Sequence, residues 1–412
     1  MTAAAVRLAD AVWLREGPLP RLLAALDSDG EEARVVGGAV RNALIGEPVG
    51  EIDLATTAVP EEVIRRGQAA GFRTVPTGIK HGTVTVIADG RSYEVTTLRR
   101  DIETFGRHAK VAFGRDWKAD AERRDFTMNA LSASADGTVH DYVGGRADLD
   151  ARRVRFIGDA AQRIAEDYLR ILRFFRFHAA YGQGAPDEAG LQACIVGRAG
   201  LDQLSRERVR MELLKLLVVR HAVPVLVVMA EVGLLIRVLG GVPDLASFSN
   251  MARVEAAMAM QPDAVRRLGA LGVRIAEDAV RLWQRLRLAN AEHDRLAYMA
   301  KDWWRVSPES EKAARVLLYR LGPERFVDRV LLAWTRSRAP ATDSAWHSLA
   351  TLPRRWTAPA FPLKADDFVK RGVEKGPALG ASLRAAEEAW IAADFPGGAP
   401  AVGAIADAAA KM

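Results

Sequence analysis

The sequence of 412 residues contains a single cysteine, Cys194, which excludes an intramolecular disulfide and a cluster of thiolate metal ligands. One thiol is typical of a protein from a reducing compartment, so we expect a cytoplasmic location. Long apolar runs are also missing. The longest lies near residues 222–230, well short of the roughly eighteen residues that a membrane-spanning helix requires. At the N-terminus, acids and arginines interrupt the apolar residues, which argues against a secretory signal.

Length, composition and charge limit the number of domains and the type of protein that this sequence can form. At 412 residues the chain is too long for one ordinary core, and two to four domains are expected. Hydrophobic residues make up 49% and charged residues 27% of the sequence, a balance typical of soluble globular proteins. The net charge is +6, and Lys and Arg outnumber the acids by eight to five in residues 99–124 and by seven to three in residues 152–176, the two segments that flank the candidate site. This distribution is compatible with a nucleic-acid partner but proves little by itself.

Two glycines mark the first candidate site. The β-branched residues 35–36 predict the end of a strand, and Gly37 and Gly38 follow directly. Without a Cβ, a Gly-Gly turn lets backbone N–H groups approach a phosphate. Arg41 comes about one helical turn after Gly38.

Two acidic residues mark a second candidate site. Glu51 and Asp53 alternate with apolar residues, so a strand would direct both carboxylates to one face. Such a pair repels unless a divalent cation lies between the two acids, and hard oxygen ligands suit Mg²⁺ carrying nucleotide phosphates. Taken alone, the pair also fits an exposed strand edge with solvated acids, but the Gly-Gly-x-x-Arg pattern upstream favours the metal. Glu94, on a later predicted strand, is left open between a third metal carboxylate and a salt bridge.

The motifs GGAVRN, at residues 37–42, and EIDLATTA, at residues 51–58, resemble the signature of the class II tRNA nucleotidyltransferase (CCA-adding enzyme) and poly(A) polymerase family, within the polymerase-β-like nucleotidyltransferases. The segment RRDFTMNA, at residues 123–130, is similar to a further family motif. By this resemblance Arg124 contacts the nucleotide. Asp125 is interpreted as orienting Arg124 or meeting the ribose.

The sequence departs from the family pattern at two positions, since members commonly carry Asp where this chain has Asn42 and Glu51. Glu51 keeps the charge and reaches one methylene further, so metal binding is expected to survive. Asn42 loses the charge, which puts the usual role of that position in doubt rather than the reaction.

Residues 72–75, 83–87 and 92–98 are rich in β-branched and aromatic residues and predict strands of a mixed sheet. The charged, glycine-interrupted stretch 99–120 follows, and we predict a mobile loop whose length indicates a function. His108, within it, is a weak candidate for catalysis.

Beyond residue 160 the pattern is helical. The segment 166–177, EDYLRILRFFRF, resembles the family's E-D-x-x-R-x-x-R motif, whereas its periodicity alone fits an amphipathic helix with a salt-bridged face. On one helix face, Asp167 and Arg170 would present an acceptor beside a donor and so select the base. The family-like helix 205–215 is interpreted as scaffold. Four residues of the segment are predicted to bind nucleotide: Asp167, Arg170, Arg173 and Arg176.

The resemblance implies an α+β N-terminal head with a mixed sheet, of the polymerase-β-like nucleotidyltransferase fold, followed by an all-α neck, body and tail. We expect an irregular, proline-containing junction over residues 339–356. The predicted domains are a nucleotidyltransferase head (1–148), a helical, nucleotide-selecting neck (149–221), a helical body (222–340) and a helical, tRNA-binding tail (341–412).

The activity that the resemblance implies is Mg²⁺-dependent, template-independent addition of CCA to tRNA 3′ ends from CTP and ATP, with release of pyrophosphate. Glu51 and Asp53 are the predicted catalytic metal ligands, while Gly38 and Arg41 are predicted to hold phosphates and Arg124 to assist. The alternatives are a poly(A) polymerase, a partial CC- or A-adding enzyme, and a catalytically inactive RNA-binding relative. No membrane partner is expected, and the oligomeric state stays open.

Overall fold

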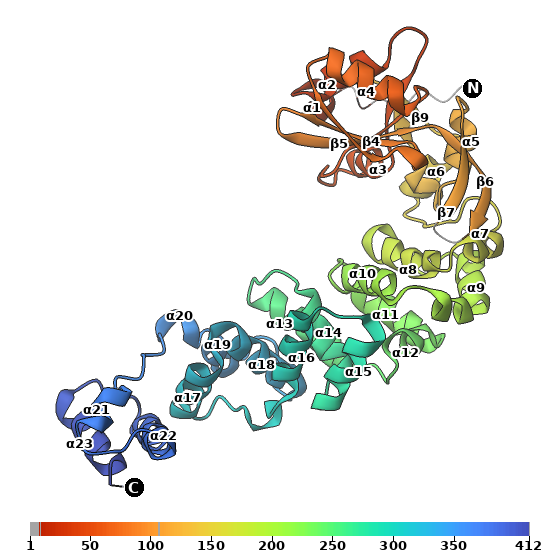
Figure 1. Ribbon diagram of the computed structural model, residues 1–412. Helices are drawn as coiled ribbons and strands as arrows, with labels where there is room; N and C mark the ends of the chain where they lie inside the picture. The colour runs from red at the N-terminus through yellow and green to blue at the C-terminus, as the bar shows by residue number, and fades with distance from the viewer. Residues whose placement is uncertain (1–7, 9, 106–107, 412) are drawn as a thin grey trace. The chain divides into compact units, whose positions relative to one another are not determined.

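The computed structural model describes Leu8 and residues 10–105 and 108–411 (Figure 1). Contacts within the chain define two compact units, one ending at Val238 and the other beginning at Leu239. No helix in the described ranges is both long and apolar enough to cross a bilayer. The candidate site lies entirely in the first unit.

A seven-stranded mixed sheet forms the centre of the head, in the order β3-β4-β5-β2-β1-β8-β9. β2 runs parallel to β5, whereas the other neighbours are antiparallel. This confirms the predicted α+β head with a mixed sheet. The strands are β1 (Ala33–Val36), β2 (Asp53–Thr56), β3 (Arg73–Gly78), β4 (Thr83–Ala88), β5 (Arg91–Thr97), β8 (Ser132–Ala133) and β9 (Val139–His140).

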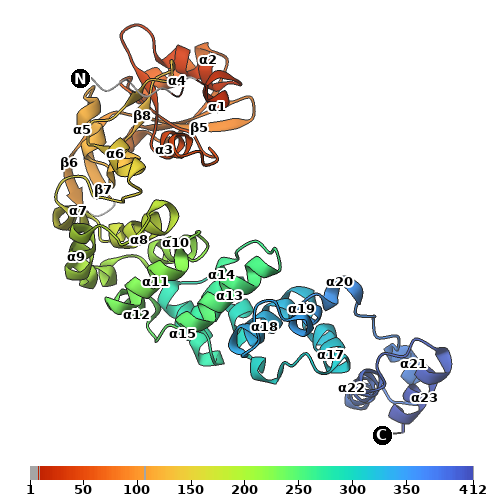
Figure 2. The same cartoon turned by 180° about the vertical axis from the view of Figure 1, so that it is seen from behind.

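Helices cover both faces of this sheet. α2 and α4 lie on one face and α3 on the other (Figures 1 and 2). α4 begins at Pro60, whose fixed φ suits the first helical position, and its acidic first turn favours the helix dipole. The apolar core between sheet and helices includes the fully buried Leu22, Val63 and Val84. The head helices are α1 (Val12–Arg15), α2 (Leu19–Leu26), α3 (Gly38–Leu44), α4 (Pro60–Ala69), α5 (Trp117–Glu122) and α6 (Gly145–Asp150).

The predicted loop over residues 99–120 is wrong as to its structure. Strands β6 (Arg99–Phe105) and β7 (His108–Phe113) pair as an antiparallel hairpin, and α5 follows. The prediction weighed charges and glycines against strand formation, but hairpin pairing uses backbone groups and does not require an apolar face. Gly106 and the side chain of His108 lie outside the described residues.

Helices build the rest of the first unit, and one prediction about them needs correction. The segment 166–177 is not a single helix, because α7 ends at Glu166 and Asp167 has an extended backbone with φ −157° and ψ 104°. Asp167 therefore lies in the break before α8. These helices are α7 (Ala160–Glu166), α8 (Leu169–Tyr181), α9 (Glu188–Gly197), α10 (Arg206–Leu217), α11 (Ala222–Glu231) and α12 (Leu234–Leu239).

The second unit is helical throughout its regular structure, as predicted. The expected irregular stretch 339–356 contains two helices, and the irregular connection follows it at residues 356–364. Proline misled the prediction because it is compatible with a first helical turn, as at Pro353 in α20. The helices are α13 (Leu245–Ala257), α14 (Ala264–Gly272), α15 (Ala276–Leu286), α16 (Asn290–Ala300), α17 (Glu311–Leu321), α18 (Pro323–Arg336), α19 (Ser344–Ala350), α20 (Leu352–Arg355), α21 (Ala365–Val369), α22 (Pro377–Ala392) and α23 (Ala399–Ala409).

Candidate active site

A polar groove of about 630 Å³ in the first unit collects most of the residues that the motifs single out. Its walls come from segments more than 150 residues apart along the chain, since Gly37 and Arg208 both line it. The head supplies the glycine turn, the acids at the start of β2, Arg41 and Arg124, whereas the segments after residue 160 supply Arg170, Arg173 and Arg208. The lining residues are Gly37, Gly38, Arg41, Glu51, Asp53, Arg124, Asp125, Asn129, Asp167, Leu169, Arg170, Arg173, Phe177 and Arg208.

The glycine turn forms one end of this groove. Gly37 follows β1 with φ +68°, a left-handed backbone conformation that residues with a Cβ rarely adopt. A Cβ at this position would also lie 3.3 Å from Nη1 of Arg124. The glycine thus serves two needs at once, the turn into α3 and the close approach of the Arg124 guanidinium.

The acid pair lies beside the turn. β2 begins at Asp53, so Glu51 precedes the strand instead of lying on it, yet both side chains are exposed and line the groove. Asp53 is paired in register with Glu94 on the parallel strand β5. Partial desolvation raises the pKa of Asp53, and the negative charges of Glu94 and Glu51 raise it further, while Arg124 acts in the opposite direction. This part of the groove therefore has a surplus of negative charge.

The described side chains contain no group of three acid, histidine or cysteine ligands placed to hold a metal ion. Any ion in this groove would be held by the pair Glu51 and Asp53 with help from a ligand or from solvent. The raised pKa of Asp53 fits that arrangement, because a cation between the carboxylates would relieve their repulsion.

Arg41, which was predicted to hold phosphates, lines the groove but is only 6% exposed, and its guanidinium is bonded to protein groups. Its Nη1 donates to Asn129 Oδ1 over 2.5 Å, and its Nη2 donates to the hydroxyl of Tyr181 over 2.7 Å. Nε and Nη2 also donate to Asn42 Oδ1, at 3.1 and 2.9 Å. Burial lowers the pKa of the Arg41 guanidinium. Asn42 Oδ1 thus supplies an acceptor for Arg41 where an aspartate would also supply one.

The resemblance motif at residues 123–130 forms the floor of the groove. Asp125 does not orient Arg124, contrary to one of the two expected roles. Its Oδ2 accepts from Nε and Nη2 of Arg173, at 2.8 and 2.6 Å, and its Oδ1 accepts from Asn129 Nδ2. Arg124 instead bonds to Asp120 over 3.3 Å. Although burial opposes ionisation, Arg173 and these hydrogen bonds hold the pKa of Asp125 below its ordinary value.

The proposed base-selecting pair lines the groove, but each member has a different partner. Asp167 Oδ2 accepts from Nη2 of Arg208 over 2.6 Å, and its Oδ1 accepts from the backbone N–H of Leu169. Arg170 uses Nη1 to bond to Glu166 and to the carbonyl of Arg163. Each therefore keeps a fixed orientation through its neighbours.

Two placements differ from what the pattern suggested. Arg176 does not line the groove, and its Nε donates to Glu212 Oε2 over 2.6 Å. Arg208, which was interpreted as scaffold, does line it and contacts Asp167. The signal was available, because Arg208 lies in the family-like segment 205–215, but nothing in the local pattern pairs it with an acid 41 residues away.

Comparisons with known proteins agree on one family. Residues 33–155 match the family described as the poly A polymerase head domain, and residues 191–248 match the probable RNA and SrmB-binding site of polymerase A. The mitochondrial CCA tRNA nucleotidyltransferase 1 of Danio rerio is 37% identical, covering 87% of this chain and 83% of the relative. The human protein of the same name is 35% identical, and the match covers 88% of this chain and 83% of the human protein.

A solved structure agrees with these relatives. The crystal structure of the Bacillus stearothermophilus CCA-adding enzyme in complex with CTP is 30% identical and matches with a TM-score of 0.74, covering 94% of both chains. The chain therefore belongs to the family of class II CCA-adding enzymes and poly(A) polymerases.

Proposed function

We propose that this protein adds C, C and A in turn to the 3′ ends of tRNA from CTP and ATP, releasing pyrophosphate at each addition. The observation that carries the proposal is the single groove that contains the acid pair, the glycine turn and the arginines of the neck. The relatives support it, since those described above are named as CCA-adding enzymes or CCA tRNA nucleotidyltransferases.

In the proposed reaction, the RNA 3′-hydroxyl attacks the α-phosphorus of the nucleotide, the bond to the bridging oxygen breaks, and pyrophosphate leaves. Glu51 and Asp53 would hold Mg²⁺. When bound, this ion would neutralise part of the negative charge of the triphosphate and lower the pKa of the attacking hydroxyl. The Gly38 backbone and the Arg124 side chain would hold phosphates. Arg173 would add positive charge at the groove wall, in the orientation that Asp125 fixes.

Asp167 and Arg170 would choose the base. Cytosine and adenine both offer an exocyclic amine beside an unprotonated ring nitrogen, which an acceptor and a donor can bind together. Uracil and guanine reverse that pattern and would leave buried polar groups unpaired, a cost of several kcal/mol. Both residues retain this capacity, because a carboxylate oxygen accepts more than one hydrogen bond and Arg170 uses only Nη1 in its bonds to Glu166 and Arg163.

One assay separates this function from its alternatives. tRNA lacking its CCA end is incubated with Mg²⁺ and each labelled nucleoside triphosphate, alone and in combination, and the products are sequenced. Addition of CCA and no more supports the proposal, whereas long adenosine tracts indicate a poly(A) polymerase and products ending in CC or in a single A indicate a partial enzyme. Absence of incorporation from every nucleotide indicates an inactive RNA-binding relative.

Mg²⁺ as the ion, the cytoplasm as the compartment and the four-part division into head, neck, body and tail belong to the same proposal. The buried free thiol of Cys194 supports a reducing compartment. The vertebrate relatives carry the word mitochondrial in their names, so fractionation of the source cells is the direct test of the compartment.

A further inference from the structure

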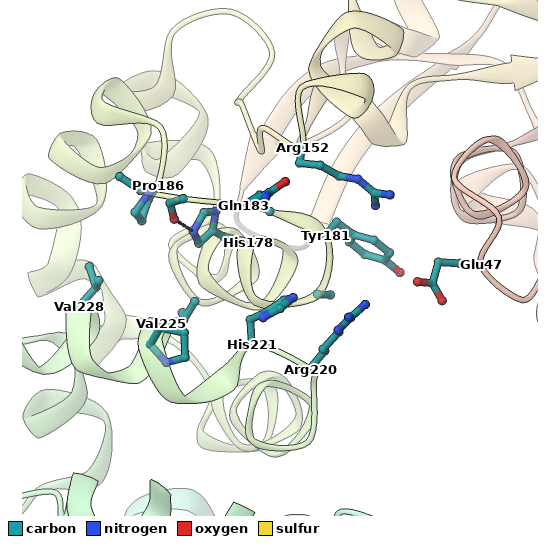
Figure 3. A pocket seen from close by; sticks show the side chains of 15 residues that line it. Glu47, Arg152, His178, Tyr181, Gln183, Pro186, Arg220, His221, Val225 and Val228 are labelled. Carbon is teal, nitrogen blue, oxygen red and sulfur yellow. Dashed lines mark hydrogen bonds between the residues drawn. The ribbon is translucent and has the colours of Figure 1, made fainter.

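A second pocket, of about 620 Å³, lies in the first unit and is distinct from the groove (Figure 3). Its size falls within the range of ligand pockets, roughly 300–1,000 Å³. It lies at the start of α11, and its polar side chains come from four segments of the chain: the connection after α3, the turn after α6, the end of α8 with the residues that follow it, and the turn between α10 and α11. The polar lining residues are Glu47, Arg152, His178, Tyr181, Gln183, Arg220 and His221.

Two arginines set this pocket apart. Every arginine that lines the groove bonds to an acid or amide oxygen, whereas no side-chain hydrogen bond, ion pair or ring contact is found for Arg152 or Arg220 within the described part of the chain. In Figure 3 the two guanidinium groups lie on either side of the Tyr181 ring, whose hydroxyl points toward Glu47. Two unpaired guanidinium groups facing one opening are suited to an anion.

The backbone fixes the direction of one of them. Arg152 has φ +51°, a left-handed conformation that is uncommon for residues other than glycine. Its N–H donates to the carbonyl of Leu149, and its carbonyl accepts from the N–H of Gln183. A half-buried arginine held in this conformation without a partner is a candidate for binding a ligand. The N-terminus of α11, just after Arg220 and His221, adds its positive dipole end to the same opening.

The pocket is coupled to the groove through one contact. Tyr181 lines the pocket, and its hydroxyl accepts the 2.7 Å hydrogen bond from Arg41, which lines the groove. The pocket and the groove therefore lie on two sides of one wall, so that a strand bound in the pocket lies next to the groove. A free nucleotide has less reason to bind here, because the groove already offers it the acid pair, the glycine turn, Arg124 and Arg173.

Glu47 indicates that the polymer bound in this pocket is RNA. Its exposed carboxylate, across the opening from Tyr181, would repel a highly charged triphosphate. It can, however, accept a hydrogen bond from a ribose 2′-hydroxyl while the arginines bind the neighbouring phosphates. Within the described residues, no hydrogen bond or ion pair engages the Glu47 side chain.

We infer that this pocket binds the RNA strand upstream of its reacting 3′ end, with Arg152 and Arg220 on backbone phosphates and Glu47 on a 2′-hydroxyl. This assignment rests on the proposed function, because it supposes that the RNA 3′ end enters the adjacent groove.

The test compares Arg152→Gln, Arg220→Gln and the double variant with the parent. Arg73→Gln is the matched control, since Arg73 is exposed on β3, three strands away from β2. Thermal unfolding checks that each variant is folded. We expect the KM for tRNA lacking CCA to rise about tenfold for each single variant, while the KM for CTP stays unchanged. The slope of log affinity for tRNA against log salt should fall by about 0.7 for each arginine removed.

A second arm tests Glu47 with tRNA whose second and third riboses from the 3′ end are 2′-deoxy, which leaves the reacting ribose intact. The parent should bind this RNA about tenfold more weakly than unmodified tRNA, and Glu47→Ala should bind the two alike.

Tenfold effects confined to tRNA support the inference. The inference is overturned if the arginine variants have the same KM for tRNA as Arg73→Gln. It is also overturned if the KM for CTP rises instead, which would assign the pocket to the triphosphate. Filter binding of tRNA keeps the test independent of catalysis. If the parent binds tRNA but adds no nucleotide, the proposed function fails while the pocket is still judged by the same binding differences.

Discussion

Replacing Asp125 by asparagine should destabilise the first unit and weaken nucleotide binding, because this carboxylate fixes Arg173 at the groove. The Arg173–Asp125 contact is 2.6 Å long, and the two side chains are 32% and 11% exposed. Removing one partner of a buried ion pair costs roughly 3–5 kcal/mol, and the partial exposure of Arg173 should reduce this to about 2–3 kcal/mol. For a unit of this size that corresponds to a fall in Tm of about 5–10 °C.

Calorimetry and steady-state kinetics measure the two effects together. The KM for CTP should rise by about tenfold or more, since Arg173 loses the carboxylate that accepts from its Nε and Nη2 and retains the longer, 3.6 Å contact with Glu212. Asp27→Asn is the control, because Asp27 is exposed at the end of α2. If Asp125→Asn melts at the same temperature as the control and binds CTP as the parent does, the pair with Arg173 does not have the role assigned to it.

The stability difference should also depend on pH. Burial opposes ionisation of Asp125, but Arg173, Asn129 and the Phe126 N–H together hold its pKa below the ordinary value. A carboxyl group of this kind contributes its stability above the unfolded pKa, about 3.9, and loses it as the pH falls through the lower folded pKa. The gap between parent and Asp125→Asn should therefore be full near neutral pH and close below about pH 4. A gap of constant size down to pH 3 would contradict the assignment.

Three further predictions concern the groove, and a fourth concerns the hairpin of β6 and β7. Asp53→Ala should abolish incorporation with tRNA affinity retained, whereas Glu51→Asp should stay active; near-parent turnover by Asp53→Ala would refute the metal assignment. With a metal chelator present at neutral pH, Asp53→Asn should raise the Tm, because folding raises the pKa of this carboxyl and so disfavours its charged form. The gain in Tm should vanish as the pH falls toward the unfolded pKa. An unchanged or lower Tm would contradict the repulsion between the carboxylates. Asp167→Ala and Arg170→Ala should admit UTP and GTP, and strict exclusion of both would place base selection elsewhere. Shortening the hairpin at residues 99–113 should impair addition of the final A more than of the two C residues, which equal losses would disprove.

Local patterns predicted the elements of the head well. Runs of β-branched residues gave strands where expected at β3, β4 and β5, because such side chains suit a pleated, half-buried surface wherever the chain later runs. Gly37 was singled out for the same kind of reason, and it has the positive φ that favours glycine. The hairpin of β6 and β7 was missed, since its pairing depends on a neighbouring strand more than on its own residues.

What the sequence determined by itself was the set of chemical groups and the family motifs that bear them: an acid pair, a glycine turn and a series of arginines. Only the tertiary structure decided which acid meets which arginine. Arg41 bonds to Tyr181, which is 140 residues away, and Asp125 holds Arg173 across 48 residues. The break at Asp167 likewise turned an expected helix face into a residue held by Arg208. Such pairings depend on the path of the chain between the partners, whereas the conformation of a glycine or a β-branched residue is largely set by the residue itself.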